Sequence, residues 1–305
     1  MNANSLTQLS LAQLIENVAV RLAESDAFYG HGTDNPEDEA RWLVMGSLGL
    51  DFDSPEEELS RAPSVEELVL VNSRTEQRLT TKLPTAYLLG EAWFAGERYF
   101  VTEDTLIPRS PFAELIFAKF DHWLEGRQPA RMLDLCSGSG CIGIAAALVF
   151  PDSVVELGEL CPEAITVAKR NIERHGLSDR VTAIESDLFA NLTGRYDLIV
   201  SNPPYVPTFE YESLPDEYYR EPKLGLEAGE DGLALVIPML QQAPDYLEDG
   251  GWLFVEVGNT EEFLAECFPE IPFLWIDFAH GGSGVFALSK QQLIEARPYL
   301  TAVEL

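Results

Sequence analysis

The spacing of apolar residues changes partway along the chain. From residue 9 to about residue 83, apolar positions recur every three or four residues, as in Leu11, Leu14 and Val18. This is the period of an amphipathic helix. We therefore expect a small helical domain at the N-terminus, over residues 1–85.

A short segment rich in aromatic residues follows the helical pattern. Between residues 86 and 108, apolar runs such as Tyr87–Leu89 and Tyr99–Val101 are broken at Gly90 and Gly96. Short aromatic runs separated by glycine are typical of paired strands. We expect a β-hairpin over residues 86–108 that links the helical domain to the rest of the chain.

The remaining stretch, residues 109–305, alternates between strand-like and helix-like segments. Strands are expected at 132–135, 154–157, 181–185, 196–201, 252–257, 273–278 and 284–288, and helices at 141–149, 162–175, 233–247 and 260–267. Such alternation predicts a mostly parallel sheet with helices on both faces. Only a short loop around Gly281 joins the last two strands. The fold class expected is therefore α/β, with a Rossmann-like, seven-stranded sheet whose last strand is antiparallel.

The composition is that of an ordinary globular protein, with 46% hydrophobic and 23% charged residues. No apolar run approaches the roughly 20 residues that span a bilayer, and the first ten residues lack the basic and apolar regions of a secretory signal. We expect a cytoplasmic protein that makes no contact with a membrane. The four cysteines form no CxxC pair and have no zinc-like spacing with histidine, so we expect neither a disulfide nor a metal site.

The charge is strongly acidic, with 20 basic and 51 acidic residues and a net charge of −31. A chain of this kind repels a nucleic-acid backbone and attracts a basic protein. Solubility alone, or life in a salt-rich habitat, is an equally good explanation of the charge.

A glycine-rich turn follows the first strand of the α/β region, in Asp134-Leu135-Cys136-Ser137-Gly138-Ser139-Gly140. Glycine lets a ligand approach the backbone, and the helix that follows offers free N–H groups. The turn lacks the third glycine of a GxGxxG dinucleotide site and the lysine of a P-loop.

Two more carboxylates, Glu159 and Asp187, end the next two strands. Open α/β sheets bind ligands at the carboxyl ends of their strands. Together with Asp134, these carboxylates therefore predict an adenosine-type cofactor. Glu159 could accept both hydroxyls of a ribose, and the neighbourhood of Asp187 could hold the amine of an adenine.

The fourth strand ends in Asn202-Pro203-Pro204-Tyr205. Two successive prolines fix the backbone and remove two N–H donors. An amide NH₂ between the Asn202 oxygen and the Pro203 carbonyl would have both hydrogens held, and Tyr205 could lie against its flat face. Accepting these hydrogens returns electron density to a nitrogen that is otherwise a poor nucleophile. Alignment of this nitrogen with a methyl sulfonium would supply much of the remaining rate acceleration.

The glycine-rich turn and the Asn-Pro-Pro-Tyr loop resemble the class I S-adenosylmethionine-dependent methyltransferases that act on planar amide or amino nitrogens. Within this class, the chain is most similar to the protein-glutamine methyltransferases of the HemK/PrmB group. The likeness covers nearly the whole chain and extends to Tyr87–Gly90, Leu106–Arg109 and Glu221–Leu226.

Within that group, residues 108–116 resemble the branch that methylates large-subunit ribosomal protein L-three, as do residues 30–34 and 256–259. The release-factor branch usually continues Pro-Arg with Pro-Glu-Thr-Glu. The resemblance therefore implies that a basic ribosomal protein is the partner, either free or in a ribosome-assembly intermediate, and that residues 1–85 recognise it.

The resemblance also implies a set of site residues. The cofactor, S-adenosyl-L-methionine, would be bound by Asp134, Cys136, Gly138, Gly140, Glu159, Asp187 and Asn202. The substrate glutamine would be held by Asn202, Pro203, Pro204 and Tyr205. Glu159 stands where the family commonly has aspartate, and Cys161 where it has serine.

Three other functions remain as alternatives. Glutamine methylation of peptide chain release factors uses the same chemistry. An adenine-N6 nucleic-acid methyltransferase uses the same Asn-Pro-Pro-Tyr logic, but it needs a basic groove, which this acidic sequence does not offer. A non-catalytic ribosome-assembly factor would bind the client without methyl transfer, although an intact acceptor loop argues against it.

Overall fold

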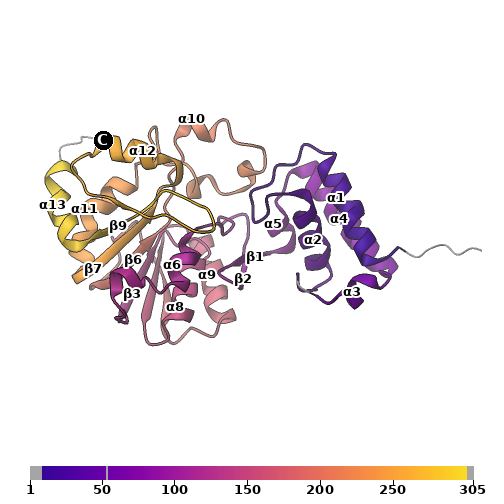
Figure 1. Cartoon of the computed structure of the whole chain (residues 1–305), viewed down its shortest axis with the longest axis horizontal. Coiled ribbons are helices and arrows are strands. Elements are labelled where there is room, and N and C mark those ends of the chain that lie inside the picture. The colour runs from indigo at the N-terminus through magenta and orange to yellow at the C-terminus, as the bar shows by residue number, and fades with distance from the viewer. Residues whose placement is uncertain (1–8, 53, 301–305) are drawn as a thin grey trace, which may run out of the picture. The chain divides into compact units, whose positions relative to one another are not determined.

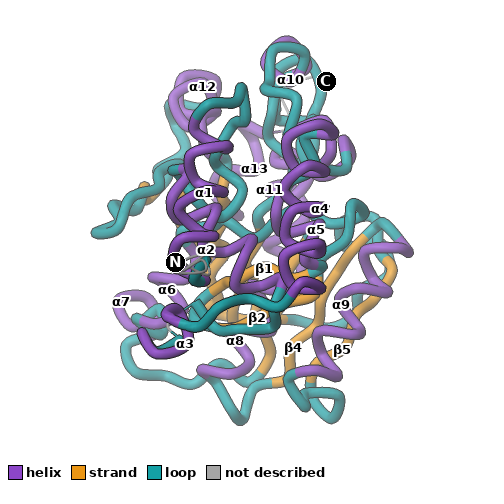
Figure 2. Tube along the Cα trace, turned by 90° about the vertical axis from the view of Figure 1, so that its right-hand side faces the viewer, coloured by secondary structure: helices purple, strands orange, loops and turns teal. Residues whose placement is uncertain are grey.

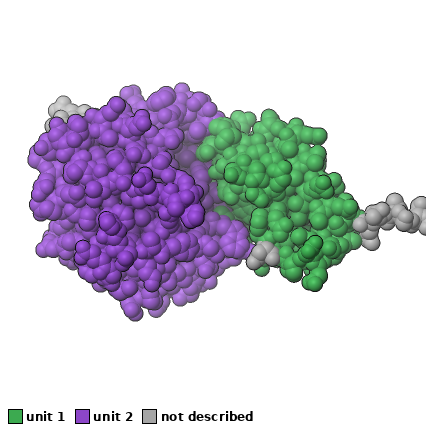
Figure 3. Space-filling model, in the orientation of Figure 1, with its two compact units in different colours: residues 1–92, 215–220 green, residues 93–214, 221–305 purple. Residues whose placement is uncertain are grey.

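The computed structural model describes residues 9–52 and 54–300. They form two compact units, coloured separately in Figure 3. The first unit contains the described chain up to Ala92 together with Pro215–Arg220, and the second contains Trp93–Leu214 and the described chain from Glu221 onward. A short stretch far along the sequence thus belongs to the N-terminal unit, which the apolar pattern does not predict.

The N-terminal unit is built from helices, namely α1 (Leu11–Ala23), α2 (Pro36–Ser47), α3 (Glu56–Ser60), α4 (Val65–Thr81) and α5 (Thr85–Leu89) (Figure 1). Ser10 and Ser64 begin α1 and α4 with a capping box, in which Gln13 and Glu67 accept the backbone N–H of the capping serine. The apolar stripes of α1, α2 and α4 pack together into a core of their own.

A buried ionic network holds Pro215–Arg220 in this unit. The Nε atom of Arg78, on α4, donates to Glu39 at 2.6 Å, and a terminal nitrogen donates to Glu217 at 2.9 Å. These three side chains are at most 5% exposed. Glu217 also accepts the backbone N–H of Phe28 at 2.9 Å. Buried charges are tolerated when they are paired and hydrogen-bonded, so each member of the network stabilises the others.

The hairpin is shorter than the expected residues 86–108, and the expectation was wrong at both ends, because residues 101–108 form no strand. Residues 85–89 form helix α5, which ends at Gly90 with a positive φ of 72°, a common helix C-terminus. The hairpin itself consists of β1 (Glu91–Phe94) and β2 (Glu97–Phe100). Ala95 and Gly96 between them have positive φ values of 48° and 79°, as the tight turns of two-residue hairpins require. Residues 86–89 are thus helical despite their strand-like sequence, and Gly90 ends the helix just before β1.

The second unit contains a seven-stranded sheet in the order β5-β4-β3-β6-β7-β9-β8. Its strands are β3 (Arg131–Leu135), β4 (Val154–Glu159), β5 (Val181–Glu185), β6 (Tyr196–Ser201), β7 (Leu247–Glu256), β8 (Leu274–Trp275) and β9 (Val285–Ser289). The first five are parallel, and β9 runs antiparallel to both β7 and β8. The expected seven-stranded α/β sheet with an antiparallel last strand is confirmed.

Helices cover both faces of this sheet (Figure 1). The apolar sides of α6 (Phe112–Phe117), α8 (Cys141–Val149) and α9 (Pro162–Arg174) pack on one face, and Figure 2 shows α9 beside β4 and β5. On the other face lie α11 (Val236–Tyr246), α12 (Glu261–Cys267) and α13 (Lys290–Leu300). Helix α13 had not been expected from the sequence. The connections of this unit contain the short helices α7 (Asp121–Leu124), α10 (Thr208–Tyr211), η2 (Lys223–Gly225) and η3 (Gly258–Thr260). The short helix η1 (Tyr218–Arg220) belongs to the N-terminal unit.

Strand β8 is shorter than the expected strand at 273–278. After β8, the N–H of Ile276 still donates to the carbonyl of Val285 on β9 at 2.9 Å. Further along, the N–H groups of Ala279 and His280 donate to the carboxylate of Glu114, at 3.0 to 3.3 Å, in place of a strand partner. No helix in the described part of the chain is both long and apolar enough to cross a bilayer.

The strand order indicates where a ligand site is expected in this sheet. Strand β3 is the first strand of the sheet in sequence, and its neighbours β4 and β6 lie on opposite sides of it. The connections from β3 and β6 therefore leave the sheet in opposite directions, and a crevice opens at their carboxyl ends.

Candidate active site

A cavity of about 220 Å³ lies at the carboxyl ends of the parallel strands, and all of its lining residues belong to the second unit. The last two residues of β4 and the connections that follow β3, β4, β5 and β6 contribute Cys136–Ser139, Gly158–Cys161, Ser186–Leu188 and Asn202–Val206. Two other segments close the cavity, Asp104–Ser110 and Pro222–Leu226 apart from Lys223. Most of the residues expected at the site are thus brought together.

The glycine-rich turn has the backbone that its sequence predicts. Gly138 has a φ of 54° and Gly140 a φ of 78°, a region that glycine adopts without strain. A Cβ atom on Gly138 would meet nothing within 4 Å, whereas one on Gly140 would lie 2.8 Å from the Cδ1 atom of Leu157. Gly138 therefore keeps the cavity wall open, and Gly140 lets the start of α8 pack on β4. Cys136 also has a positive φ, 60°, which is costly for a residue with a side chain.

Asp134 lies beneath the cavity and does not line it. The side chain is 1% exposed, and its Oδ2 atom accepts the backbone N–H of Gly143 at 2.8 Å. Its Oδ1 atom has no hydrogen-bond partner among the described residues. Burial raises the pKa of Asp134 to about 7, with a smaller opposing effect from the Gly143 N–H. Gly140 likewise does not line the cavity, so these two residues support the turn from below.

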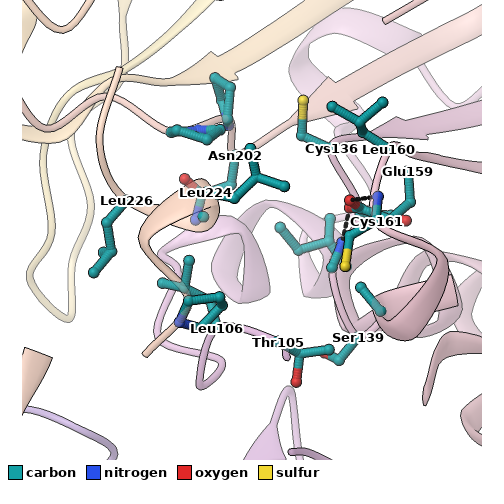
Figure 4. A pocket seen from close by; sticks show the side chains of 18 of the residues that line it. Thr105, Leu106, Cys136, Ser139, Glu159, Leu160, Cys161, Asn202, Leu224 and Leu226 are labelled. Carbon is teal, nitrogen blue, oxygen red and sulfur yellow. Dashed lines mark hydrogen bonds between the residues drawn. The ribbon is translucent and has the colours of Figure 1, made fainter. Parts of the chain in front are cut away.

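Glu159 is the carboxylate that faces the cavity from β4 (Figure 4). Its Oε2 atom accepts the N–H of Gly138 at 2.8 Å, and its Oε1 atom accepts the N–H of Cys161 at 2.9 Å. Each oxygen keeps acceptor capacity, because a carboxylate has about four lone-pair positions. The next residue, Leu160, is 47% exposed and lines the same cavity. The site therefore presents a fixed anion beside an apolar surface.

Asp187 lines the cavity from the connection after β5. The turn that presents it is held by Ser186, whose hydroxyl donates to the carbonyl of Leu188 at 2.7 Å and accepts the N–H of Asn191 at 3.0 Å. The Asp187 side chain remains exposed. It is thus available to a ligand at the edge of the site.

The Asn-Pro-Pro-Tyr loop begins where β6 ends. Ser201 anchors the strand end, because its hydroxyl donates to the carbonyl of Leu135 on β3 at 2.6 Å. Asn202, Pro203, Pro204 and Tyr205 all line the cavity. In Figure 4, Asn202 and Glu159 lie on opposite sides of the pocket, and Leu224 lies near Asn202. The loop then leaves the site as Val206 pairs with Glu227.

The sequence reasoning missed Glu256 as a cavity residue. It ends β7, is 4% exposed and lines the cavity. Its Oε2 atom accepts the hydroxyl of Ser110 at 2.5 Å, and its Oε1 atom lies 3.4 Å from the hydroxyl of Tyr205. Burial raises the pKa of Glu256 to about 7. In the sequence, only its place in residues 256–259, one of the segments that carry the family resemblance, pointed to Glu256.

Arg109 also lines the cavity. Its guanidinium forms a two-pronged ion pair with Glu221, at 2.6 and 2.9 Å. The Glu221 side chain is 0% exposed. The pair ties together the two segments that close the cavity.

Comparisons with known proteins agree with this architecture. Residues 115–213 match the family model of the methyltransferase small domain. The catalytic domain of hMettl16, solved in complex with an RNA hairpin of the MAT2A 3′UTR, has a similar fold, with a TM-score of 0.50, 18% identity and coverage of 75% of this chain and 84% of that one.

Closer relatives match nearly the entire chain. The ribosomal protein uL3 glutamine methyltransferase of Francisella tularensis is 43% identical over 276 residues, which cover 90% of this chain and 88% of that protein. The protein of the same name from Xanthomonas campestris is 44% identical over 290 residues, which cover 93% and 92%. At this identity and coverage, the chain belongs to the family of ribosomal protein uL3 glutamine methyltransferases.

Proposed function

We propose that the chain transfers a methyl group from S-adenosylmethionine to the side-chain amide nitrogen of a glutamine in ribosomal protein uL3, the protein called L-three above. The observation that carries this proposal is that Asn202–Tyr205 and Glu159 line one cavity. An acceptor loop for a planar amide thus faces a site suited to an adenosine cofactor. The names of the curated relatives support the choice of substrate.

The cavity fits S-adenosylmethionine. Glu159 is held by two backbone N–H groups and retains acceptor positions for two ribose hydroxyls. The exposed side chain of Leu160 would pack against the adenine ring. Asp187 lines the edge of the cavity, where it would accept a hydrogen bond from the adenine amine. Asp134, with one unpartnered buried oxygen, lies beneath the turn and supports it. When bound, the cofactor supplies an electrophilic methyl group on a positively charged sulfur.

The acceptor loop addresses the low nucleophilicity of the amide. The Asn202 side-chain oxygen and the Pro203 carbonyl accept the two N–H hydrogens of the substrate glutamine, and the ring of Tyr205 packs on the amide plane. The rigid Pro203–Pro204 backbone, both residues of which are buried, keeps these acceptors aimed before substrate arrives. Preorganised acceptors of this kind act most strongly where water is excluded.

We assign recognition of the substrate to the helical domain, residues 1–85, and to the negative charge of the chain. A net charge of −31 favours encounter with a basic ribosomal protein. The reaction would take place in the cytoplasm during ribosome biogenesis, on free uL3 or on an assembly intermediate.

The test is methyl transfer from labelled S-adenosylmethionine to purified uL3, with a peptide chain release factor and an adenine-containing oligonucleotide as alternative acceptors. We expect label on one glutamine of uL3, located by mass spectrometry. Label on the release factor or the oligonucleotide instead would identify those substrates. Absence of transfer to all three, with the cofactor still bound, would favour a non-catalytic binding protein.

Asn202→Ala tests the chemistry of the loop. We expect single-turnover methylation to slow by about 10²-fold, as for removal of a preorganised hydrogen-bond partner, with cofactor affinity mostly retained. Asn191→Ala is the matched control, because Asn191 is exposed and lies outside the cavity lining. A rate near that of the parent for Asn202→Ala would contradict the acceptor model.

A further inference from the structure

Glu256 occupies a position in the sheet that is level with the acceptor loop. Strands β6 and β7 are paired in parallel, with Ser201 opposite Val255. The residue after Ser201 is Asn202, and the residue after Val255 is Glu256. Sheet register alone therefore places a buried carboxylate beside the first residue of the loop.

The contacts of Glu256 join three separate segments. One carboxylate oxygen accepts the hydroxyl of Ser110 at 2.5 Å, and the other lies 3.4 Å from the hydroxyl of Tyr205. The Ser110 oxygen also accepts the backbone N–H of Phe112 at 3.2 Å, at the start of α6, so the serine hydroxyl hydrogen is directed to Glu256. The carboxylate thus connects the end of β7, the entrance to α6 and the acceptor loop.

Burial of an acidic side chain is unfavourable unless its oxygens are satisfied. In the described part of the chain, both hydrogen-bond partners of Glu256 are hydroxyls. An apolar residue would fill this position without the cost of desolvating a carboxylate. The arrangement therefore favours a role for the two hydrogen bonds over a role in stability.

Two glycines allow close packing around Tyr205, one against its ring and one against its backbone carbonyl. A Cβ atom on Gly258 would lie 2.6 Å from the Cε2 atom of the Tyr205 ring, and one on Gly232 would lie 2.4 Å from the Tyr205 carbonyl oxygen. The same Cβ atom on Gly258 would lie 2.8 Å from Cζ and 3.1 Å from the hydroxyl oxygen of Tyr205. Gly258 therefore packs against the hydroxyl end of the ring, where Glu256 accepts the hydroxyl hydrogen.

We propose that Glu256 is the positioning residue that fixes the Tyr205 ring in the acceptor loop, by accepting the Tyr205 hydroxyl while Ser110 anchors the carboxylate. Glu256 acts on the substrate amide only through Tyr205, and it takes no part in cofactor binding. This inference rests on the proposed function, since it assigns a role to Tyr205 in holding the amide.

The kinetic test uses full-length chain with Glu256→Ala and Glu256→Gln in single-turnover methylation of uL3. We expect Glu256→Ala to slow the reaction by about 10-fold to 100-fold, because a small misplacement of a reacting group has effects of this size. The calorimetric Kd for S-adenosylmethionine should stay unchanged. Glu256→Gln should restore most of the rate, since its carbonyl accepts from Tyr205 and its NH₂ donates to Ser110.

A double-mutant cycle tests whether the effect passes through Tyr205. If it does, Glu256→Ala should slow the reaction much less in a Tyr205→Phe background than in the parent, because residues in one network are not additive. An equal loss in both backgrounds would overturn the proposal, as would a Glu256→Gln rate as low as that of Glu256→Ala. Glu262→Ala, at an exposed position on α12, is the control and should leave the rate unchanged.

A measurement without substrate separates this inference from the proposed function. In chain with ¹³C-labelled tyrosine rings, the Tyr205 signal is assigned by its loss in Tyr205→Phe. We expect Glu256→Ala to shift and broaden this signal, and Glu256→Gln to leave it nearly in place. Should Glu256→Ala fail to fold, Ser110→Ala removes the anchor and should produce a smaller shift. An unchanged Tyr205 signal in the folded variants would overturn the proposal, whichever protein proves to be the substrate.

Discussion

Glu159→Gln isolates the charge of the carboxylate that would bind the cofactor ribose. In the present structure the two oxygens accept from Gly138 at 2.8 Å and from Cys161 at 2.9 Å. Glutamine keeps the size of the side chain but has one carbonyl oxygen, so its NH₂ group must face one of these N–H groups. The variant therefore loses one backbone hydrogen bond and offers one acceptor fewer to the ribose.

The expected magnitude follows from those losses. Hydrogen bonds to a charged group contribute about 1.5–3 kcal/mol each, and the cofactor loses at least one and at most two of them. We expect the Kd for S-adenosylmethionine to rise by about 10²-fold, since each 1.4 kcal/mol corresponds to roughly tenfold.

Isothermal titration calorimetry at fixed salt measures this Kd. Glu185→Gln is the matched control, because Glu185 ends the neighbouring strand β5 but is exposed and lies outside the cavity lining. Thermal unfolding of each variant shows whether the fold is retained. A Kd for folded Glu159→Gln equal to that of the parent would refute the assignment of Glu159 to the cofactor.

The remaining predictions concern stability, pH, loop packing and salt. Arg78→Met leaves two buried carboxylates without their cation and should lower the free energy of unfolding by about 3–5 kcal/mol in urea titrations; a loss near zero would mean that the network contributes nothing. The pKa of Asp134, about 7 when folded, lies above its unfolded value, so its contribution to stability is fully present below about pH 4 and declines as the pH rises to about 7. Asp134→Asn should flatten that decline in pH-dependent unfolding, and an unaltered slope would be inconsistent with a protonated native carboxyl. Gly258→Ala would place a Cβ atom 2.6 Å from the Tyr205 ring and should slow methylation about tenfold or more while cofactor Kd is kept; equal losses in rate and affinity would show a wider collapse. Added salt should slow association with uL3 in stopped-flow measurements, because salt screens the attraction between a net charge of −31 and a basic protein. An association rate that does not change with salt would mean that the charge serves solubility alone.

The parallel strands were the most predictable part of the fold. Strands β5 and β6 have the bounds expected from their apolar runs, 181–185 and 196–201. Strand β6 is buried at five of its six positions, and such strands read as nearly continuous apolar segments. Once these strands were placed, the carboxyl-end residues Glu159, Asp187 and Asn202 followed, and the cavity brings them together.

Other features depend on contacts that no local pattern contains. Asp134 adjoins the glycine-rich turn in sequence, yet its side chain points beneath the cavity to Gly143. The partners of Glu256 lie 146 and 51 residues away along the chain, so only the folded sheet shows that they meet.

The membership of Pro215–Arg220 in the N-terminal unit has a consequence for how this protein can be inherited or engineered. A gene fragment that ends at Ala92 encodes Arg78 and Glu39 but not Glu217, and its product would keep a buried guanidinium with half of its anionic partners. A chimera that takes only its first 92 residues from a relative keeps Glu217 from this chain, so its network is complete where the relative supplies groups equivalent to Arg78 and Glu39. Moving the helical module as a complete unit therefore requires two separate segments of the gene.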